Sequence, residues 1–231
     1  PTRRSSDLNF KTYFQHVNAP ICLFELREVS QLAIFNIVHS LKNSNSAGLD
    51  GISSKVLVAI LPSILPQLTA LINHSIRTGV VPDSLKIAKV IPVFKGGDCS
   101  HPSNYRPISL LPTISKVLEK VVEKQFRFYL ESNGLLFPNQ FGFRKKHTTS
   151  NALLKLTNFI SNKSMVGEKV IAIFLDLKKA FDTVNASILL YKLSFYGVHG
   201  TALKWFESYI TGRSQCTLYN ETISSQLPIQ C

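Results

Sequence analysis

Asp176 is the residue whose type and position most directly indicate chemistry in this sequence. It ends the run Lys169-Val-Ile-Ala-Ile-Phe-Leu-Asp176, whose apolar residues fall on both faces and predict a strand buried in a sheet. A carboxylate at the end of such a strand is costly unless it is paired or binds a metal ion. Asp176 is therefore a candidate metal ligand; alternatively, it caps the next turn or pairs with Lys178 or Lys179.

The charge of the chain favours a polyanionic partner. The 231 residues include 26 basic and 14 acidic side chains, which give a net charge of +12. Such an excess favours nucleic acid first and an acidic membrane surface second, and the alternative is a solvated basic surface. No apolar run reaches the roughly 18 residues that a membrane-spanning helix needs, so we expect no membrane partner.

The cysteines and histidines predict no zinc site. Four cysteines are scattered along the chain without metal-ligand spacing, at Cys22, Cys99, Cys216 and Cys231. The six histidines form no pattern with cysteines or acids. We interpret the cysteines as reduced intracellular thiols and not as a disulfide framework.

The pattern of apolar residues predicts an α+β (mixed α/β) fold around Asp176. A composition of 45% hydrophobic residues is sufficient for a folded core. Residues 1–28 are aperiodic and are expected to form a linker. Helices are expected over 28–42, 53–77 (with Pro62 opening a second helix), 113–132, 149–161, 186–196 and 201–211; strands are expected over 86–94 and 169–176, with a hairpin that pairs 213–219 with 225–231.

Three loops separate these elements. Residues 43–51 are rich in turn formers, and Asp50 and Gly51 are expected to shape the turn before the next helix. Residues 95–106 form a polar loop, and residues 139–147 form a basic loop that precedes a helix capped by Thr149 or Ser150.

Five stretches, in the same order, resemble the reverse transcriptases of non-LTR (LINE-like, jockey/CR1-type) retrotransposons. They span roughly residues 29–231 and so cover most of the chain. The stretches are Ser46-Ala-Gly-Leu-Asp50-Gly51, Ile91-Pro-Val-Phe-Lys95-Gly-Gly-Asp98, Asn104-Tyr-Arg106-Pro-Ile-Ser-Leu-Leu111, Asn139-Gln-Phe-Gly-Phe-Arg144-Lys-Lys-His147 and Phe174-Leu-Asp176-Leu-Lys-Lys-Ala-Phe181-Asp182. The last of these resembles motif A of the family. A maturase-like protein related to group II introns would share the fold, but the residues of these motifs resemble the LINE-like pattern more closely.

The resemblance implies the fingers and an incomplete palm of a right-hand polymerase. Residues 29–165 would form the fingers region, and residues 166–231 would form a partial palm that stops before motifs B and C. The chain contains no adjacent pair of acidic residues, so the Asp-Asp hairpin of the family is absent from it. We therefore expect an N-terminal fragment of a reverse transcriptase domain, with residues 1–28 as the linker to whatever precedes it.

The resemblance also assigns roles around the metal ions. Two Mg²⁺ ions in the intact enzyme would stabilise the attacking and leaving oxygens of nucleotidyl transfer. Asp176 would be a catalytic metal ligand, and the carbonyl of Leu177 a second, backbone ligand. Phe181 matches the position of the steric gate, where a ring crowds a 2′-hydroxyl; packing in the core is the alternative for this aromatic residue.

Basic residues complete the implied site. Lys95 and Arg106 resemble the fingers residues that hold the triphosphate of the incoming dNTP, for which a guanidinium is suited because it binds phosphate oxygens through two parallel hydrogen bonds. Arg144, Lys145 and Lys146 would contact the backbone of the nucleic acid without reading its sequence. For Lys95 and for the basic cluster, a solvated loop is the alternative.

The implied reaction is RNA-templated DNA synthesis from a DNA primer, inside the cell and with access to the nucleus. One carboxylate cannot assemble a two-metal site, so we expect the isolated chain to be inactive, with a buried strand whose neighbours are supplied from elsewhere. The alternative function is a non-catalytic, nucleic-acid-binding relic or co-opted module. Mg²⁺-dependent primer extension by the purified chain would contradict the expected inactivity.

Overall fold

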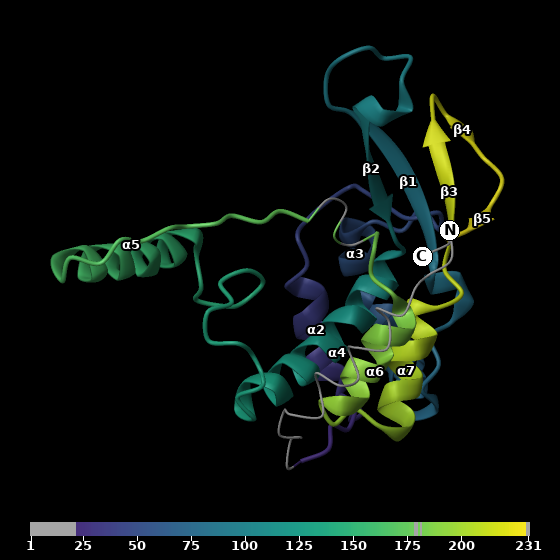
Figure 1. The fold of residues 1–231 in the computed structure, drawn as a ribbon. Coiled ribbons are helices and arrows are strands. Elements are labelled where there is room, and N and C mark those ends of the chain that lie inside the picture. The colour runs from purple at the N-terminus through teal and green to yellow at the C-terminus, as the bar shows by residue number, and fades with distance from the viewer. Residues whose placement is uncertain (1–21, 178–179, 181, 230–231) are drawn as a thin grey trace. The chain divides into compact units, whose positions relative to one another are not determined.

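The computed structural model describes residues 22–177, 180 and 182–229. They form two compact units (Figure 1). The larger unit contains the described residues up to Tyr129 and those from Val184 onward, and the smaller unit contains Leu130–Thr183. The expected division into fingers and palm at residue 165 stays a prediction.

The elements confirm the expected mixed α/β class. Helices are α2 (Gln31–His39), α3 (Ser54–Thr78), α4 (Thr113–Ser132), α5 (Thr149–Met165), α6 (Ala186–Phe195) and α7 (Gly200–Ile210); strands are β1 (Ile87–Phe94), β2 (Tyr105–Leu110), β3 (Ser214–Tyr219), β4 (Thr222–Ile223) and β5 (Leu227–Pro228). The bounds of α4 match the prediction, while α5 begins after Thr148, whose side chain accepts from Asn151 N–H, and continues past residue 161.

The sheet joins two regions that are far apart in the sequence. Its strand order is β2-β1-β3-β4, with β5 also paired to β3. The strand β1 is antiparallel to β2 and parallel to β3, where Ile87 lies opposite Ser214. The expected hairpin is present as the antiparallel pairing of β3 with β5, and Asn220 and Glu221 turn the chain into β4 with positive φ angles of 45° and 66°.

The strand β2 begins inside a region that was expected to be a loop and continues past its end. Residues 95–106 were expected to be irregular, but the strand begins at Tyr105 and places Pro107 opposite Pro92 of β1. Proline cannot donate a hydrogen bond to a neighbouring strand, so it is tolerated at the edge of a sheet. Since β2 is the edge strand of this sheet, Pro107 is compatible with its position.

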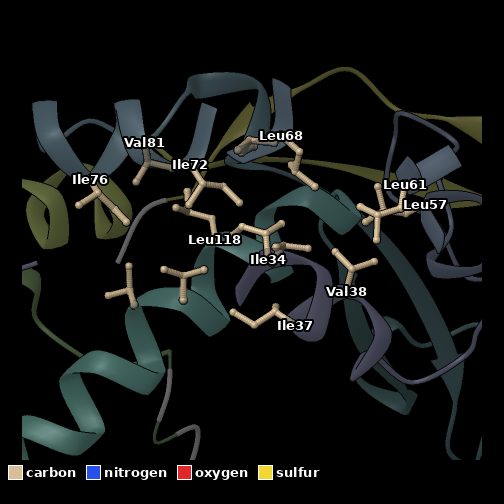
Figure 2. Packing of buried hydrophobic residues seen from close by; sticks show 14 of the residues in the cluster. Ile34, Ile37, Val38, Leu57, Leu61, Leu68, Ile72, Ile76, Val81 and Leu118 are labelled. Atoms are coloured by element: carbon tan, nitrogen blue, oxygen red, sulfur yellow. The ribbon is translucent and has the colours of Figure 1, made fainter. Parts of the chain in front are cut away.

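The core of the larger unit forms around one face of α3 (Figure 2). Each fully buried aliphatic side chain contributes roughly 1.5–3 kcal/mol by the area removed from water. The cluster includes Ile34, Ile37 and Val38 of α2, Leu57, Leu61, Leu68, Ile72 and Ile76 of α3, Val117, Leu118, Val121 and Val122 of α4, and Trp205 of α7. The helix predicted over residues 113–132 is thus confirmed, and its buried apolar residues form a core face.

The prediction that Pro62 opens a second helix is wrong. The helix α3 is continuous from Ser54 to Thr78 and contains both Pro62 and Pro66. A proline inside a helix frees the carbonyl of the residue four positions earlier. Both prolines and Val58 are exposed, so the freed carbonyls of Val58 and Pro62 can bond to water while the opposite face stays packed.

As one continuous helix, α3 is long and apolar enough to cross a membrane by length and composition. The core helix of a globular domain passes the same test. Only 28% of the most apolar window of α3 is buried, but Leu57, Leu61 and Ile72 lie fully buried in the cluster shared with α2, α4 and α7, so one face of α3 is a core face.

The end of α3 packs closely against the beginning of α7. Gly79 ends the helix with a left-handed φ of 67°, and a Cβ atom there would lie 2.8 Å from the carbonyl oxygen of Thr201. Nearby, the buried hydroxyl of Ser75 donates to the carbonyl of Val80 at 2.7 Å and accepts from the Trp205 indole N–H at 3.1 Å. The Ser75 hydroxyl and the Trp205 indole N–H are thus both satisfied, so their burial is not penalised.

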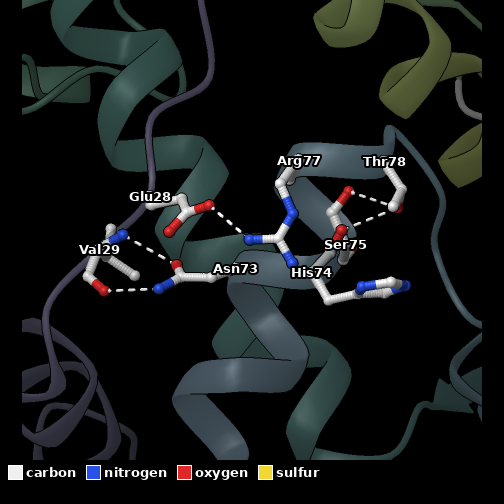
Figure 3. A network of polar contacts seen from close by, with 7 residues as sticks. All are labelled: Glu28, Val29, Asn73, His74, Ser75, Arg77 and Thr78. Atoms are coloured by element: carbon white, nitrogen blue, oxygen red, sulfur yellow. Dashed lines mark hydrogen bonds and ion pairs between the residues drawn. The ribbon is translucent and has the colours of Figure 1, made fainter.

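Residues 22–29, which include the described part of the expected linker, pack on the larger unit. Asn73 binds the backbone of Val29 through both its amide oxygen and its amide nitrogen, and Arg77 pairs with Glu28 at 2.9 Å (Figure 3). Gln125 binds the backbone of Arg27 in the same two-point manner. The ring of Phe24 is also buried among the rings of Phe126, Tyr129 and Phe206, so both backbone contacts and side-chain packing hold this segment.

The strand predicted over residues 169–176 is not formed. The structure assigns no regular element to residues 168–177, and their apolar side chains from Ile171 onward are exposed, with Ile171 at 89%, Phe174 at 82% and Leu175 at 90%. A strand needs neighbours for its backbone hydrogen bonds. Among the described residues, this segment pairs with none of the strands. The expectation that the neighbours of this segment are supplied from elsewhere stays a prediction.

Replacing Gly79 tests the contact between α3 and α7. In Gly79→Ala, the left-handed φ and the clash with Thr201 together should lower the free energy of unfolding by about 2–4 kcal/mol. Gly51 has a similar φ of 71° but open space around it, so Gly51→Ala is the matched control and should cost about 1 kcal/mol. Urea denaturation of both variants measures the difference; equal losses would show that the close approach at Gly79 is not important.

Candidate nucleotide and nucleic-acid site

The β1–β2 hairpin brings Lys95 and Arg106 to the same end of the sheet. Lys95 directly follows β1, and its backbone N–H donates to the carbonyl of Asn104 at 2.9 Å. Arg106 lies in β2 opposite Val93 of β1, and both basic side chains are exposed. The hairpin register therefore places two cations, which are eleven positions apart in the sequence, within one short segment of the sheet.

The loop between these strands has its own hydrogen bonds. Asn104 donates from its side chain to the carbonyl of Asp98 at 2.8 Å, and Gly97 (φ 95°) packs on that side chain. The Asp98 carboxylate accepts from the backbone N–H of Ser100 at 2.9 Å. This bond favours the ionised form and lowers the pKa of Asp98. The loop next to Lys95 is therefore ordered by its own polar groups.

Aromatic side chains connect the hairpin to β3. Phe94 and Tyr105 are cross-strand partners whose ring centroids are 5.4 Å apart, and the Tyr105 hydroxyl donates to the carbonyl of Cys99 at 3.0 Å. Desolvation, and then a hydrogen bond with Tyr219 of β3, raises the pKa of Tyr105. Arg106 follows Tyr105 directly, so these contacts also restrict where its backbone lies.

Two of the recognised stretches meet at the start of α4. A Cβ atom on Gly48 would lie 2.7 Å from the backbone nitrogen of Pro112, and the buried Thr113 hydroxyl donates to the carbonyl of Ile52 at 2.5 Å. Asp50 accepts from the N–H of Ile52 at 3.2 Å. The prediction that Asp50 and Gly51 shape a turn is confirmed, and this turn supports the end of the segment that carries Arg106.

A polar cluster that the sequence did not predict lies between α4 and α7. Tyr209 stacks on Trp205 with 5.3 Å between ring centroids. The Arg213 guanidinium lies 5.0 Å from the centroid of the Tyr209 ring. Burial, reinforced by the Glu119 carboxylate, raises the pKa of Tyr209 to about 12. No motif marks these residues, because α4 and α7 are far apart in the chain.

The predicted metal ligands, Asp176 and Leu177, lie in the smaller unit. Both side chains are exposed, and neither residue belongs to a strand. Phe181, the expected steric gate, lies outside the described residues. Within the part of the chain that the structure describes, no three side chains of His, Cys, Asp or Glu are grouped so that they could hold a metal ion. Asp176 is thus a single candidate ligand and not a formed metal centre.

The basic cluster forms a turn in the smaller unit. Arg144 is partly buried, and its guanidinium donates to the carbonyl of Phe137 at 3.0 Å. Lys145 and Lys146 are exposed, and Lys146 has a φ of 61°. Arg144 therefore holds the turn together, whereas the two lysines present their charges to solvent.

Comparison with known proteins identifies the family. Residues 93–229 match the family described as "Reverse transcriptase (RNA-dependent DNA polymerase)". This range begins in β1, covers β2, α4, α5, α6 and α7, and ends just after β5. It includes Lys95, Arg106 and Asp176.

Three relatives from Drosophila melanogaster illustrate the similarity. The chain is 28% identical over 91% of its length to "Probable RNA-directed DNA polymerase from transposon X-element", 33% identical over 79% to "Putative 115 kDa protein in type-1 retrotransposable element R1DM", and 30% identical over 76% to "RNA-directed DNA polymerase from mobile element jockey". The matched part covers 23%, 18% and 19% of these relatives, so the chain spans about a fifth of their length.

The family match agrees with the order of the motifs and with the mixed α/β fold, since all three indicate a reverse transcriptase domain. The match covers more than half of the chain. The chain belongs to the reverse transcriptase (RNA-dependent DNA polymerase) family and is part of a reverse transcriptase domain of the non-LTR retrotransposon type.

Proposed function

We propose that this chain supplies the nucleotide-binding hairpin and one metal ligand of an enzyme that copies RNA into DNA. The observation that carries the proposal is the hairpin that holds Lys95 and Arg106 together inside the segment that matches the reverse transcriptase family. Reverse transcriptases extend a DNA primer with dNTPs along an RNA template. For this chain, those partners and that reaction are the proposal.

Lys95 and Arg106 bind the triphosphate of the incoming dNTP. Both are exposed on one hairpin, so a polyanionic ligand reaches them without displacing a protein partner. The guanidinium orients the triphosphate through two parallel hydrogen bonds, whereas the ammonium of Lys95 acts as a point charge. Contacts of Asn104 and Tyr105 fix the backbone next to Lys95 and Arg106. The hairpin therefore needs little further ordering when the nucleotide binds.

Asp176 binds one of two Mg²⁺ ions, and the Leu177 carbonyl is the accompanying backbone ligand. When bound, the metal ions stabilise the charge that develops on the oxygens of nucleotidyl transfer. Hard oxygen ligands such as these suit Mg²⁺. The described residues contain no group of three acidic, His or Cys side chains that could complete a metal site, so in this proposal the remaining carboxylates come from another part of the longer protein.

The remaining assignments concern the sugar and the template. Phe181 contacts the deoxyribose and excludes a 2′-hydroxyl. Lys145 and Lys146, supported by Arg144, contact template phosphates. Copying at a chromosomal target requires the protein to act in the nucleus.

A second candidate function is a nucleic-acid-binding module without polymerase activity. It is favoured by one observation, the exposed position of Asp176 without further acidic ligands among the described residues. Such a module uses the basic side chains but does not need Asp176. The two functions therefore differ in what a substitution of Asp176 does.

Removing Arg106 tests the triphosphate site. In the longer protein, Arg106→Ala should raise the KM for dNTP by about 10- to 100-fold, because a charge-assisted hydrogen bond contributes about 1.5–3 kcal/mol. Arg77→Ala is the matched control, since Arg77 of α3 is also exposed but pairs with Glu28, and it should leave KM unchanged. Steady-state primer extension at varied dNTP concentrations measures both. An unchanged KM for Arg106→Ala would exclude this role.

Removing the charge of Asp176 separates the two candidate functions. In the longer protein, Asp176→Asn should reduce the rate of primer extension by about 100-fold or more, because a metal ion supplies several kcal/mol of transition-state stabilisation. Binding of single-stranded nucleic acid should be unchanged. Glu168→Gln, which removes an exposed carboxylate of the same unit, is the control. Equal extension by the two variants would exclude Asp176 as a metal ligand, whereas nucleic-acid binding without any primer extension by the wild-type longer protein would favour the non-catalytic module.

A further inference from the structure

The strand β1 has one face against the core and one face away from it. Ala88 and Val90 are 4% and 6% exposed, so their side chains lie on the core face. Successive side chains of a strand point to opposite faces, and Lys89 therefore lies on the other face. Its cross-strand partners there are Leu110 of β2 and Cys216 of β3.

Arg106 lies on the same face of the sheet as Lys89. It is the cross-strand partner of Val93, which is four positions after Lys89 and so points in the same direction. Between them lies the pair of Ile91 with Ile108, and Ile108 is 45% exposed. We call this surface the outer face of the hairpin; its residues are Lys89, Ile91, Val93, Arg106 and Ile108.

Lys89 is a half-buried cation without a counterion among the described residues. It forms neither a hydrogen bond nor an ion pair with any of them. Lys86, just before the same strand, is buried but pairs with Asp83 at 2.7 Å. Moving a cation out of water is unfavourable unless an anion compensates it. The aliphatic stem of Lys89 can pack on the sheet, but its ammonium is left for a partner from outside.

The spacing of the cations on the outer face of the hairpin indicates an extended polyanion. Lys89 is about 13 Å along β1 from the residue opposite Arg106, because a strand rises about 3.3 Å per residue. Lys95 follows β1 and lies beyond Arg106, away from Lys89. A triphosphate held by Lys95 and Arg106 therefore leaves Lys89 free for another phosphate. A single strand of nucleic acid has a charge on every nucleotide and apolar faces on its bases, which suit the isoleucines between the cations.

We propose that the outer face of the hairpin binds single-stranded nucleic acid, with Lys89 on a backbone phosphate and Ile91 and Ile108 against the bases. The strand then lies beside the nucleotide that Arg106 holds, so this inference rests on the proposed triphosphate site. A segment of the longer protein is the competing occupant of the isoleucine surface. Cations at both ends of that surface favour the polyanion, since a protein segment would need a carboxylate at each end.

The test removes the charge of Lys89 and keeps a stem of similar length. The 231-residue chain and Lys89→Met are titrated with a fluorescent single-stranded thymidine oligonucleotide at several salt concentrations, and anisotropy gives each Kd. Lys89→Met should reduce the slope of log K against log salt by about 0.7, the loss of one phosphate contact, and weaken binding by about 5- to 10-fold at about 50 mM salt. Lys89→Arg should retain the wild-type slope.

Two controls separate this contact from folding and from general charge. Lys89→Met removes a half-buried charge, so its Tm should equal or exceed that of the wild type. Lys124→Met removes an exposed lysine of α4 and should leave both the Kd and the salt slope unchanged. An equal change of slope in Lys124→Met would overturn a specific role for Lys89.

A second variant tests the isoleucine surface. Ile108→Thr keeps a β-branched residue in the exposed edge strand, so the strand should still form. It should weaken binding of the thymidine oligonucleotide by about 3- to 10-fold, through lost apolar contact, but not binding of an abasic oligonucleotide of the same length. Unchanged binding in both Lys89→Met and Ile108→Thr would overturn the proposal and favour a protein segment on this face.

Failure of this inference is distinguishable from failure of the proposed function. The triphosphate site is tested separately by the KM for dNTP of Arg106→Ala in the longer protein. If Arg106→Ala raises that KM while Lys89→Met binds the oligonucleotide like the wild type, the strand contact is wrong and the triphosphate site stands. If Arg106→Ala leaves KM unchanged while Lys89→Met weakens binding, the triphosphate site is wrong and the phosphate contact of Lys89 stands.

Discussion

The larger unit depends on the contact between Trp205 of α7 and Ser75 at the end of α3. The indole is buried in the cluster built by α2, α3 and α4, and its N–H is satisfied by the Ser75 hydroxyl, which itself donates to Val80. An indole of this size is buried without penalty only when its N–H has a partner. This contact brings residues 184–229 back to a core that residues 24–129 begin.

The candidate nucleotide site depends on this return of the chain. The strand β3 follows α7 and pairs in parallel with β1, and Tyr219 at its end contacts Tyr105 beside Arg106. Without β3, the β1–β2 hairpin would be an isolated two-stranded ribbon, which is marginally stable in water. The position of Lys95 and Arg106 is therefore a consequence of helix packing elsewhere in the unit.

Asp176 shows the opposite case, in which a clear local pattern does not produce the expected element. Residues 169–176 have the apolar composition of a buried strand, yet they are irregular and exposed. A helix satisfies its backbone hydrogen bonds within its own segment, but a strand requires a neighbour. The described residues supply none for this segment. A carboxylate that was expected at the end of a sheet therefore lies in an exposed, irregular segment.

The sequence by itself determined the elements whose information is local. The helices α4, α6 and α7 and the strand β1 lie within a residue or so of their predicted bounds, because apolar periodicity and turn residues act over a few positions. The five motifs were sufficient to recognise the family, and to name Lys95, Arg106 and Asp176. Only the tertiary structure decided that β1 pairs with β3, that α3 continues through Pro62, and that residues 22–29 pack on the core. These features depend on contacts between residues far apart in the chain, which no local pattern encodes.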